Sequence, residues 1–266
     1  IASLIGTGKI SLLYYSDRIM ELPLSLFGIA IATVTLPYLS RLYSNNSMSK
    51  FSDAMAWSIR IACMLIIPAA IGLFVLAEPI VAAIFYGGMF DSHDVFLTAL
   101  SLKAFSIGLI GFSFVKILSP AYFARKDTLT PVKIGIYCLF LNIILGSSSV
   151  YYLNKIDYEG THLGLALSIS VAAILNAGLL FSGLKKKNII KRLSGFKGFI
   201  AKLLIANLFM LIFLTYSIQP LEWWLSLGVL KRFSWLVFFI LVSVGIYVLI
   251  LSLLGIKIKE LRFQEE

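Results

Sequence analysis

Residues 13–23 read Leu-Tyr-Tyr-Ser-Asp-Arg-Ile-Met-Glu-Leu-Pro and lie inside a long apolar stretch, 11–38. A helix that crosses a bilayer needs about 20 predominantly apolar residues. Asp17, Arg18 and Glu21 are the only charged residues of this stretch. Because charge inside a bilayer is costly and usually functional, the stretch predicts a membrane-spanning helix that carries a polar site.

The rest of the chain repeats the apolar pattern. Hydrophobic residues make up 59% of the sequence, charged residues only 14%, and the mean hydropathy is +0.94. A soluble fold of this size could not bury so much apolar surface. No segment shows the sustained period-two alternation of barrel strands, so we predict an all-α polytopic membrane protein. Its predicted spans are 11–38, 55–77, 95–123, 131–153, 162–184, 199–217 and 233–255.

Prolines and short runs mark the irregular places. Pro23 and Pro68 lie inside spans and should kink them, because proline removes a backbone donor. The run 80–86 after Pro79 is too short to cross a membrane, and we expect an interfacial or re-entrant segment. Residues 1–8 resemble the tail of a preceding span, and no signal peptide opens the sequence. We therefore expect the chain to be part of a longer protein.

The basic residues between spans predict the orientation. If the first span runs from outside to inside, 15 Lys and Arg lie on the inner side and 4 on the outer side, the latter being Lys9, Lys155, Lys231 and Arg232. This bias places the C-terminus in the cytoplasm. The basic segment 185–198 then divides residues 1–184 from a final helix pair in 199–266, and we expect it to anchor helix ends.

Several classes of function are disfavoured. The net charge is +10, and most of the basic residues lie between apolar spans. We therefore expect these residues to contact membrane lipids rather than nucleic acid. Cys63 and Cys138 lie in apolar runs without companions at ligand spacing, which predicts no metal and no disulfide. The carboxylates near Arg18 have no His, Ser or metal-ligand companion, so we expect neither an enzyme nor a cofactor.

Charged, hydroxylic and small residues of the first span share one helix face. At 100° per residue, seven of them fall within about 60° of one direction. Asp17 lies on the same flank, and Arg18 can pair with Glu21 at i,i+3. The face should line a hydrated cavity that handles substrate or ions, or form a buried structural ion pair. The seven residues are Tyr14, Arg18, Glu21, Ser25, Gly28, Ala32 and Thr35.

Other polar groups also fall inside spans. Lys103 is a candidate for cavity lining or for an interface. Asn142 is a candidate cavity or ion ligand, although mid-span Asn142 and Asn176 more commonly hydrogen-bond to a neighbouring helix. Arg60 and Lys116 lie near helix ends, from which their side chains can extend to the headgroups.

The motif at 14–23 closely resembles the MurJ (MviN) family of lipid II flippases. The resemblance continues through Gly28-Ile29-Ala30, Leu36-Pro37 and Gly108-Leu109-Ile110-Gly111. It extends in order through 115–120, 122–127 and 130–134, covers essentially the whole chain, and indicates the eighth to fourteenth helices of such a protein.

The resemblance implies the second lobe of a multidrug/oligosaccharidyl-lipid/polysaccharide transporter fold in the bacterial inner membrane. Two extra C-terminal helices would form an apolar groove for a polyprenyl tail. Arg18 corresponds to a cavity arginine that meets the diphosphate of lipid II, with Glu21 as the nearby acid and Asp17, Tyr14 and Ser25 beside it. The other cavity arginines belong to the first lobe, without which we expect no transport.

The resemblance leaves the coupling ion open, and two other functions stay possible from the sequence. Some members bind sodium through an Asn and an acid one turn later, where this sequence has Asn142 and Gly146; coupling to sodium or to the membrane potential stays open. A cation-coupled exporter of small amphiphiles on the same fold is the alternative, and Arg18 argues against it. A membrane scaffold protein whose charged helix docks a partner is the third reading.

Overall fold

The computed structural model describes residues 8–156, 158–190 and 195–256. Seven helices in these ranges are long and apolar enough to cross a membrane. The predicted tail of a preceding span at 1–7, part of the basic segment at 191–194 and the C-terminal tail at 257–266 lie outside the described residues. The elements are α1 (Lys9–Pro23), η2 (Leu24–Ile29), α2 (Ala30–Ser44), α3 (Met48–Val75), α4 (Ala77–Phe85), α5 (Ser92–Phe123), α6 (Leu129–Lys155), α7 (His162–Lys186), α8 (Phe196–Ser217), α9 (Leu221–Ser226) and α10 (Val229–Leu253).

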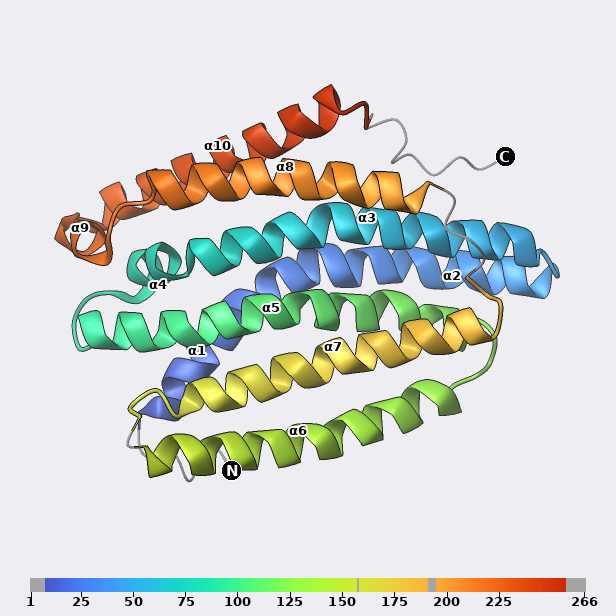
Figure 1. The fold of residues 1–266 in the computed structure, drawn as a ribbon, viewed down its shortest axis with the longest axis horizontal. Helices are drawn as coiled ribbons and strands as arrows, with labels where there is room; N and C mark the ends of the chain where they lie inside the picture. The colour runs from blue at the N-terminus through green and yellow to red at the C-terminus, as the bar shows by residue number, and fades with distance from the viewer. Residues whose placement is uncertain (1–7, 157, 191–194, 257–266) are drawn as a thin grey trace.

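The long helices lie side by side, and successive spans run in opposite directions (Figure 1). One end of the bundle holds Lys9, Ser92 and α9 and is called the Lys9 end. The opposite end holds Ser44, Phe123 and Lys186 and is called the Ser44 end. Helix α5 occupies the centre and packs against α1, α3 and α7, while α6 packs mainly on α7. Helix α8 packs on α3, and α10 packs on α8 and α4.

The predicted spans are all present, with shifted ends. Helix α3 begins at Met48, before the predicted start at 55, and α4 begins at Ala77, ahead of Pro79. Helix α4 is too short to cross a membrane, as predicted, and its residues Val81 and Ala82 are fully buried. Helix α10 begins at Val229. Lys231 and Arg232 therefore belong to a helix and not to the predicted outer loop.

The first span contains a π-helical turn, η2, which directly follows Pro23. Proline cannot donate the i→i−4 hydrogen bond, and a π turn accommodates one extra residue. The extra residue rotates the later part of the span by roughly 100° relative to an ideal α-helix. The prediction of one continuous polar face is therefore wrong beyond Ser25. Gly28 packs on Ser113 and Thr35 hydrogen-bonds to Ser58, both inside the protein.

Helices α5 and α7 approach closely because two glycines of α5 face α7. A Cβ atom at Gly111 would lie 2.5 Å from the backbone nitrogen of Ile174, and one at Gly108 would lie 2.9 Å from the Cα of Ser170. The Ser170 hydroxyl donates a 2.9 Å hydrogen bond to the carbonyl of Ala104 across the same interface. Small residues at helix contacts allow such approach in membrane proteins.

The C-terminal helix pair shares the main apolar core of the molecule. The Tyr247 hydroxyl on α10 donates a 2.7 Å hydrogen bond to the Met64 carbonyl on α3. Trp224 of α9 is fully buried, and Met210 of α8 belongs to the same core cluster. The pair therefore packs directly on α3 and α4.

Candidate functional site

Arg18 and Glu21 form an ion pair on α1. The Arg18 Nη1 atom donates a 2.7 Å hydrogen bond to Glu21 Oε2, and the guanidinium lies 4.7 Å from the centre of the Tyr14 ring. The two charged side chains remain 55% and 46% exposed in this half-length chain. The pair therefore lies on an open side of the bundle, where Tyr14, Arg18 and Glu21 share one face of α1.

The remaining members of the predicted cluster flank this pair. Asp17 is partly buried and forms no ion pair within the described part of the chain, while Ser25 is exposed on η2. Two carboxylates beside one guanidinium leave an excess of negative charge when both are ionised. The cluster can therefore accept a further cationic group, or release Arg18 to an anionic ligand that forms bidentate hydrogen bonds.

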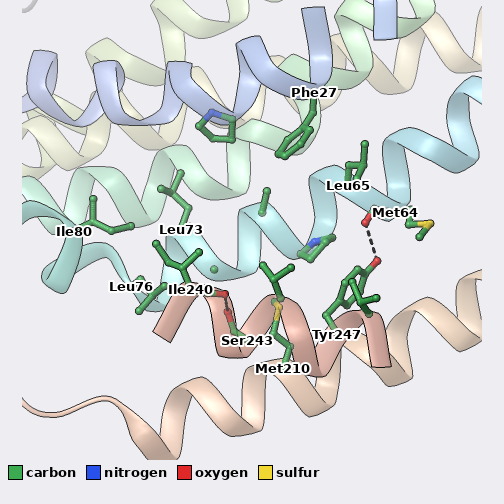
Figure 2. Close-up of a pocket in the computed structure, with 16 residues that line it drawn as sticks. Phe27, Met64, Leu65, Leu73, Leu76, Ile80, Met210, Ile240, Ser243 and Tyr247 are labelled. Carbon is green, nitrogen blue, oxygen red and sulfur yellow. Dashed lines mark hydrogen bonds between the residues drawn. The ribbon is translucent and has the colours of Figure 1, made fainter. Parts of the chain in front are cut away.

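An apolar cavity of about 370 Å³ adjoins the same helix (Figure 2). Pro23 and Phe27 close it on the side of the first span, and α3, the start of α4, α8 and α10 provide the rest. Figure 2 shows Phe27, Leu73, Met210 and Tyr247 around one space. The lining is otherwise Met64, Leu65, Pro68, Ala69, Gly72, Leu76, Ile80, Ile240, Ser243, Val244 and Val248.

The chemistry of this cavity suits a hydrocarbon chain. The Ser243 hydroxyl donates to the Ile240 carbonyl and the Tyr247 hydroxyl to the Met64 carbonyl, so both polar side chains are satisfied by the protein. The lining therefore offers apolar contacts without unpaired hydrogen-bonding side chains. A Cβ atom at Gly72 would contact nothing within 4 Å, which leaves room beside α3.

A second pocket, of about 340 Å³, lies between α5, α6 and α7, with Leu24 of η2 at its edge. It brings together Lys116, Asn142 and Asn176, and we call it the polar pocket. In the described part of the chain neither asparagine hydrogen-bonds to a neighbouring helix, and the Asn176 Oδ1 atom is buried without a partner. The expectation of interhelical asparagine bonds is wrong for these residues.

Lys103 lines neither cavity. Its Nζ atom donates a 2.6 Å hydrogen bond to Glu78 Oε1 in the first turn of α4, and both side chains are more than two-thirds buried. Lys103 therefore joins α5 to α4, and its role in a cavity or at the membrane interface stays a prediction. Glu78 was not among the predicted site residues.

The residues present do not fit the sodium pattern of the family. Gly146 supplies no ligand oxygen, and a Cβ atom there would already lie 3.2 Å from Leu165 and from the Ser168 hydroxyl. That hydroxyl donates to the Leu165 carbonyl. Within the described ranges, no three His, Cys, Asp or Glu residues gather as metal ligands.

Arg232 is a second residue whose role was not predicted from the sequence. Its guanidinium donates to the carbonyls of Ala82 and Tyr86 at the end of α4 and of Trp224 and Leu225 in α9, at 3.0–3.3 Å. The side chain is buried and lies 4.6 Å from the Tyr86 ring centre. C-terminal carbonyls of helices lack partners and favour a cation. Arg232 thus joins α10 to α4 and α9 at the Lys9 end.

A matching contact joins two connections at the Ser44 end. Lys187, just after α7, donates a 2.5 Å hydrogen bond to Asp127 in the connection between α5 and α6. This hydrogen bond, with further ones from Thr130, lowers the pKa of the Asp127 carboxyl to about 2.

Comparison with known proteins agrees with this architecture. The model of the family described as lipid II flippase MurJ matches residues 1–253. A "Probable lipid II flippase MurJ" of Vibrio cholerae is 40% identical over 266 residues, covering 100% of this chain and 49% of the relative. The corresponding Haemophilus influenzae protein is 39% identical over 97% of this chain and 50% of its own length. The chain thus spans about half the length of these curated relatives.

The fold agrees as well. A solved structure, "Lipid II flippase MurJ, inward closed conformation", superposes with a TM-score of 0.72 at 26% identity, covering 95% of this chain and 48% of that one. The architecture is therefore that of one lobe of a multidrug/oligosaccharidyl-lipid/polysaccharide transporter with two extra helices. The family match and the apolar spans together place it as a multi-pass inner-membrane protein. The chain belongs to the MurJ family of lipid II flippases.

Proposed function

We propose that this chain is the second lobe of a protein that flips lipid II across the bacterial inner membrane. One observation carries the proposal: α1 and η2 present an exposed Arg18–Glu21 pair and, one turn on, border an apolar cavity of about 370 Å³. A lipid-linked diphosphate needs both surfaces, a cationic one for its phosphates and an apolar one for its tail.

Arg18 acts by exchanging partners. Placing a guanidinium in mid-helix costs at least about 2.5–3.5 kcal/mol on insertion scales, and Glu21 offsets part of that cost between turnovers. A diphosphate replaces the carboxylate with two parallel N–H···O bonds that match the planar guanidinium. Asp17, Tyr14 and Ser25 complete the site, together with cationic groups of the missing N-terminal lobe, which is required for transport.

The cavity between α3, α8 and α10 holds the tail. In this arrangement residues 1–184 are the transporter lobe, 185–198 a basic cytoplasmic linker, and 199–266 the helix pair that forms the groove with a short cytoplasmic tail. The headgroup crosses by alternating access of the two lobes. Flipping breaks no covalent bond, so the proposed activity is not that of an enzyme and its chemistry requires no cofactor.

The experiment compares Arg18 variants in the full-length protein. Arg18→Lys keeps the charge but lacks the planar fork, and we expect it to lose most lipid II translocation in proteoliposomes. Arg18→Ala should lose all of it, while Glu21→Gln should impair transport less than either. Membrane accumulation and thermal unfolding serve as controls for folding. Arg18→Ala that accumulates normally and flips lipid II at the wild-type rate would reduce Arg18 to a structural role.

The orientation is tested separately. Ser47 and Tyr158 lie at opposite ends of the bundle, and the charge bias places Ser47 in the cytoplasm. Single cysteines at the two positions should react with a membrane-impermeant maleimide from opposite sides. Labelling from the same side would overturn the topology.

A further inference from the structure

We propose that Lys103 and Glu78 are positioning residues for the lipid tail: their ion pair fixes α4, and α4 forms the wall of the apolar cavity at its Lys9 end. This role rests on the proposed function, because it takes the polyprenyl tail of lipid II as the occupant of that cavity. Neither residue lines the cavity, so both act on the tail through α4.

Helix α4 meets the cavity with one face. Ile80 of α4 and Leu76, directly before the helix, line the cavity together with Leu73 of α3. Figure 2 shows these three side chains at the same end of the space. Because α4 is only nine residues long, it meets the cavity through little more than one turn. A rotation of α4 about its axis would therefore move Ile80 out of the wall.

Glu78 lies on the opposite face of α4. Two residues separate it from Ile80, which corresponds to about 160° around the helix, so its carboxylate points away from the cavity and toward α5. The Lys103 Nζ atom donates the 2.6 Å hydrogen bond to Glu78 Oε1 at this contact, and both side chains are largely buried. The contact fixes the rotation of α4 and thereby the direction of Ile80.

Arg232 holds the other end of α4. Its guanidinium donates hydrogen bonds to the carbonyls of Ala82 and Tyr86, and it belongs to α10. Helix α10 also lines the cavity, through Ile240 and Val244 among others. Helix α4 is thus held between α5, which fixes its start, and α10, which fixes its end. The shape of the cavity at this end therefore depends on the ion pair with α5 as well as on apolar packing.

Stability alone does not account for the ion pair. Lys103 lies inside a helix that is long and apolar enough to cross a membrane, where a charge is costly. Replacing a buried ion pair with apolar side chains of similar volume is often neutral or stabilising. A short hydrogen bond between two charged groups has a defined direction and length, whereas apolar contacts are non-directional. The Lys103–Glu78 pair therefore contributes a fixed position of α4 rather than extra stability.

The test measures the binding of two ligands to the full-length protein by native mass spectrometry. One ligand is lipid II with its full polyprenyl chain, and the other is an analogue whose chain is cut to two isoprene units. Both carry the same diphosphate headgroup, so the ratio of their dissociation constants reports the contribution of the tail. Thermal unfolding of the same samples reports stability.

The decisive variant is the double substitution Lys103→Met with Glu78→Met, which removes both charges. We expect it to unfold at the wild-type temperature or above, whereas each single substitution leaves a buried charge unpaired and should unfold at a lower temperature. The affinity of the double variant for full-chain lipid II should fall about fivefold, and its affinity for the short-chain analogue should not change. The matched control, Lys187→Met with Asp127→Asn, removes the ion pair at the Ser44 end and should bind both ligands as the wild type does.

The outcomes separate this role from the proposed function. Wild-type affinity of the double variant for full-chain lipid II would overturn the positioning role and leave the tail site intact. An equal loss for both ligands, or failure of the double variant to accumulate, would give the pair a general structural role and overturn the proposal as well. Equal binding of the two ligands by the wild type would instead overturn the tail site itself, and the positioning role with it. Arg18→Ala should weaken both ligands alike, because it removes a headgroup contact.

Discussion

The contact of α5 with α7 and the contact of α10 with α3 are built in opposite ways. Gly108 and Gly111 bring α5 so close to α7 that no side chain fits between the backbones. Between α10 and α3, by contrast, an apolar cavity of about 370 Å³ remains, and Tyr247 bridges it with one hydrogen bond. Protein interiors are normally packed without such voids. The first interface therefore holds two backbones in contact, whereas the second retains an apolar space between its helices.

The largest effect is expected when the close contact between α5 and α7, the closed interface, is broken. Gly111→Ala would place a methyl group 2.5 Å from the Ile174 nitrogen and 2.6 Å from the Ala173 carbonyl carbon, and a backbone cannot yield as a side chain does. We expect a loss of at least about 4 kcal/mol in unfolding free energy and little protein in the membrane, measured by accumulation and thermal unfolding. Gly178→Ala, where a Cβ meets nothing within 4 Å, is the control. Equal stability of both variants would contradict the close contact.

The next largest effect is expected at Arg232, which holds α10 in place beside the open interface, the contact of α10 with α3. Arg232→Met leaves four carbonyls of α4 and α9 without their donor, and we expect a loss of about 2–3 kcal/mol in unfolding free energy. Arg232→Lys should recover part of it. Lys231→Met, at the exposed preceding position, should change stability little. Indistinguishable melting of the Arg232 and Lys231 variants would show that the helix pair is held by apolar contacts alone.

The sequence predicted the helices well because apolar length is a local property. It failed where a contact between distant segments decided the role of a residue. Arg232 follows Lys231 near a predicted loop, and nothing in that neighbourhood indicates that α4, 150 residues earlier, supplies its acceptors. Asn142 and Asn176 likewise looked like separate packing residues, since only the fold brings α6 and α7 together.

A smaller effect is expected when the open interface is filled. Gly72→Leu places a side chain in the empty part of the apolar cavity, with a good helix former and no clash. We expect normal accumulation and about a tenfold lower rate of lipid II translocation in proteoliposomes, since the tail loses its space. Gly178→Leu on the outer side of α7 is the size-matched control. Full transport by Gly72→Leu would mean that the tail lies elsewhere.

The smallest effect concerns the connection that clamps the closed interface at the Ser44 end. The pKa of Asp127 is lowered to about 2, so its contact with Lys187 stabilises the folded state above the ordinary carboxyl pKa near 4 and is lost as the pH falls from about 4 to about 2. Because the pair is partly exposed, we expect Asp127→Asn to cost less than about 1 kcal/mol at pH 7.

The measurement is thermal unfolding of the full-length protein in detergent at pH 7 and pH 3. The difference between wild type and Asp127→Asn should shrink at the lower pH. Asp53→Asn, an exposed carboxylate away from this contact, should behave as the wild type does. A constant difference between pH 7 and pH 3 would show that Asp127 acts without its charge.

The candidate site was predictable only as far as the first π turn. Asp17, Arg18 and Glu21 could be assigned to one face because the helix before Pro23 is regular. Gly28 and Thr35 could not, since periodicity alone does not report an inserted residue.

The π turn η2 also affects how the first span aligns with related sequences. A helix with one surplus residue has two phases, one before Leu24 and one after Ile29, so a single wheel diagram drawn over residues 9–44 describes neither half. An insertion or deletion of one residue within η2 would rephase α2 against α1 while leaving both hydrophobic patterns intact. Alignments that slide a gap freely across this turn would then preserve the motif around Arg18 and yet rotate the assigned buried face of α2 by roughly 100°.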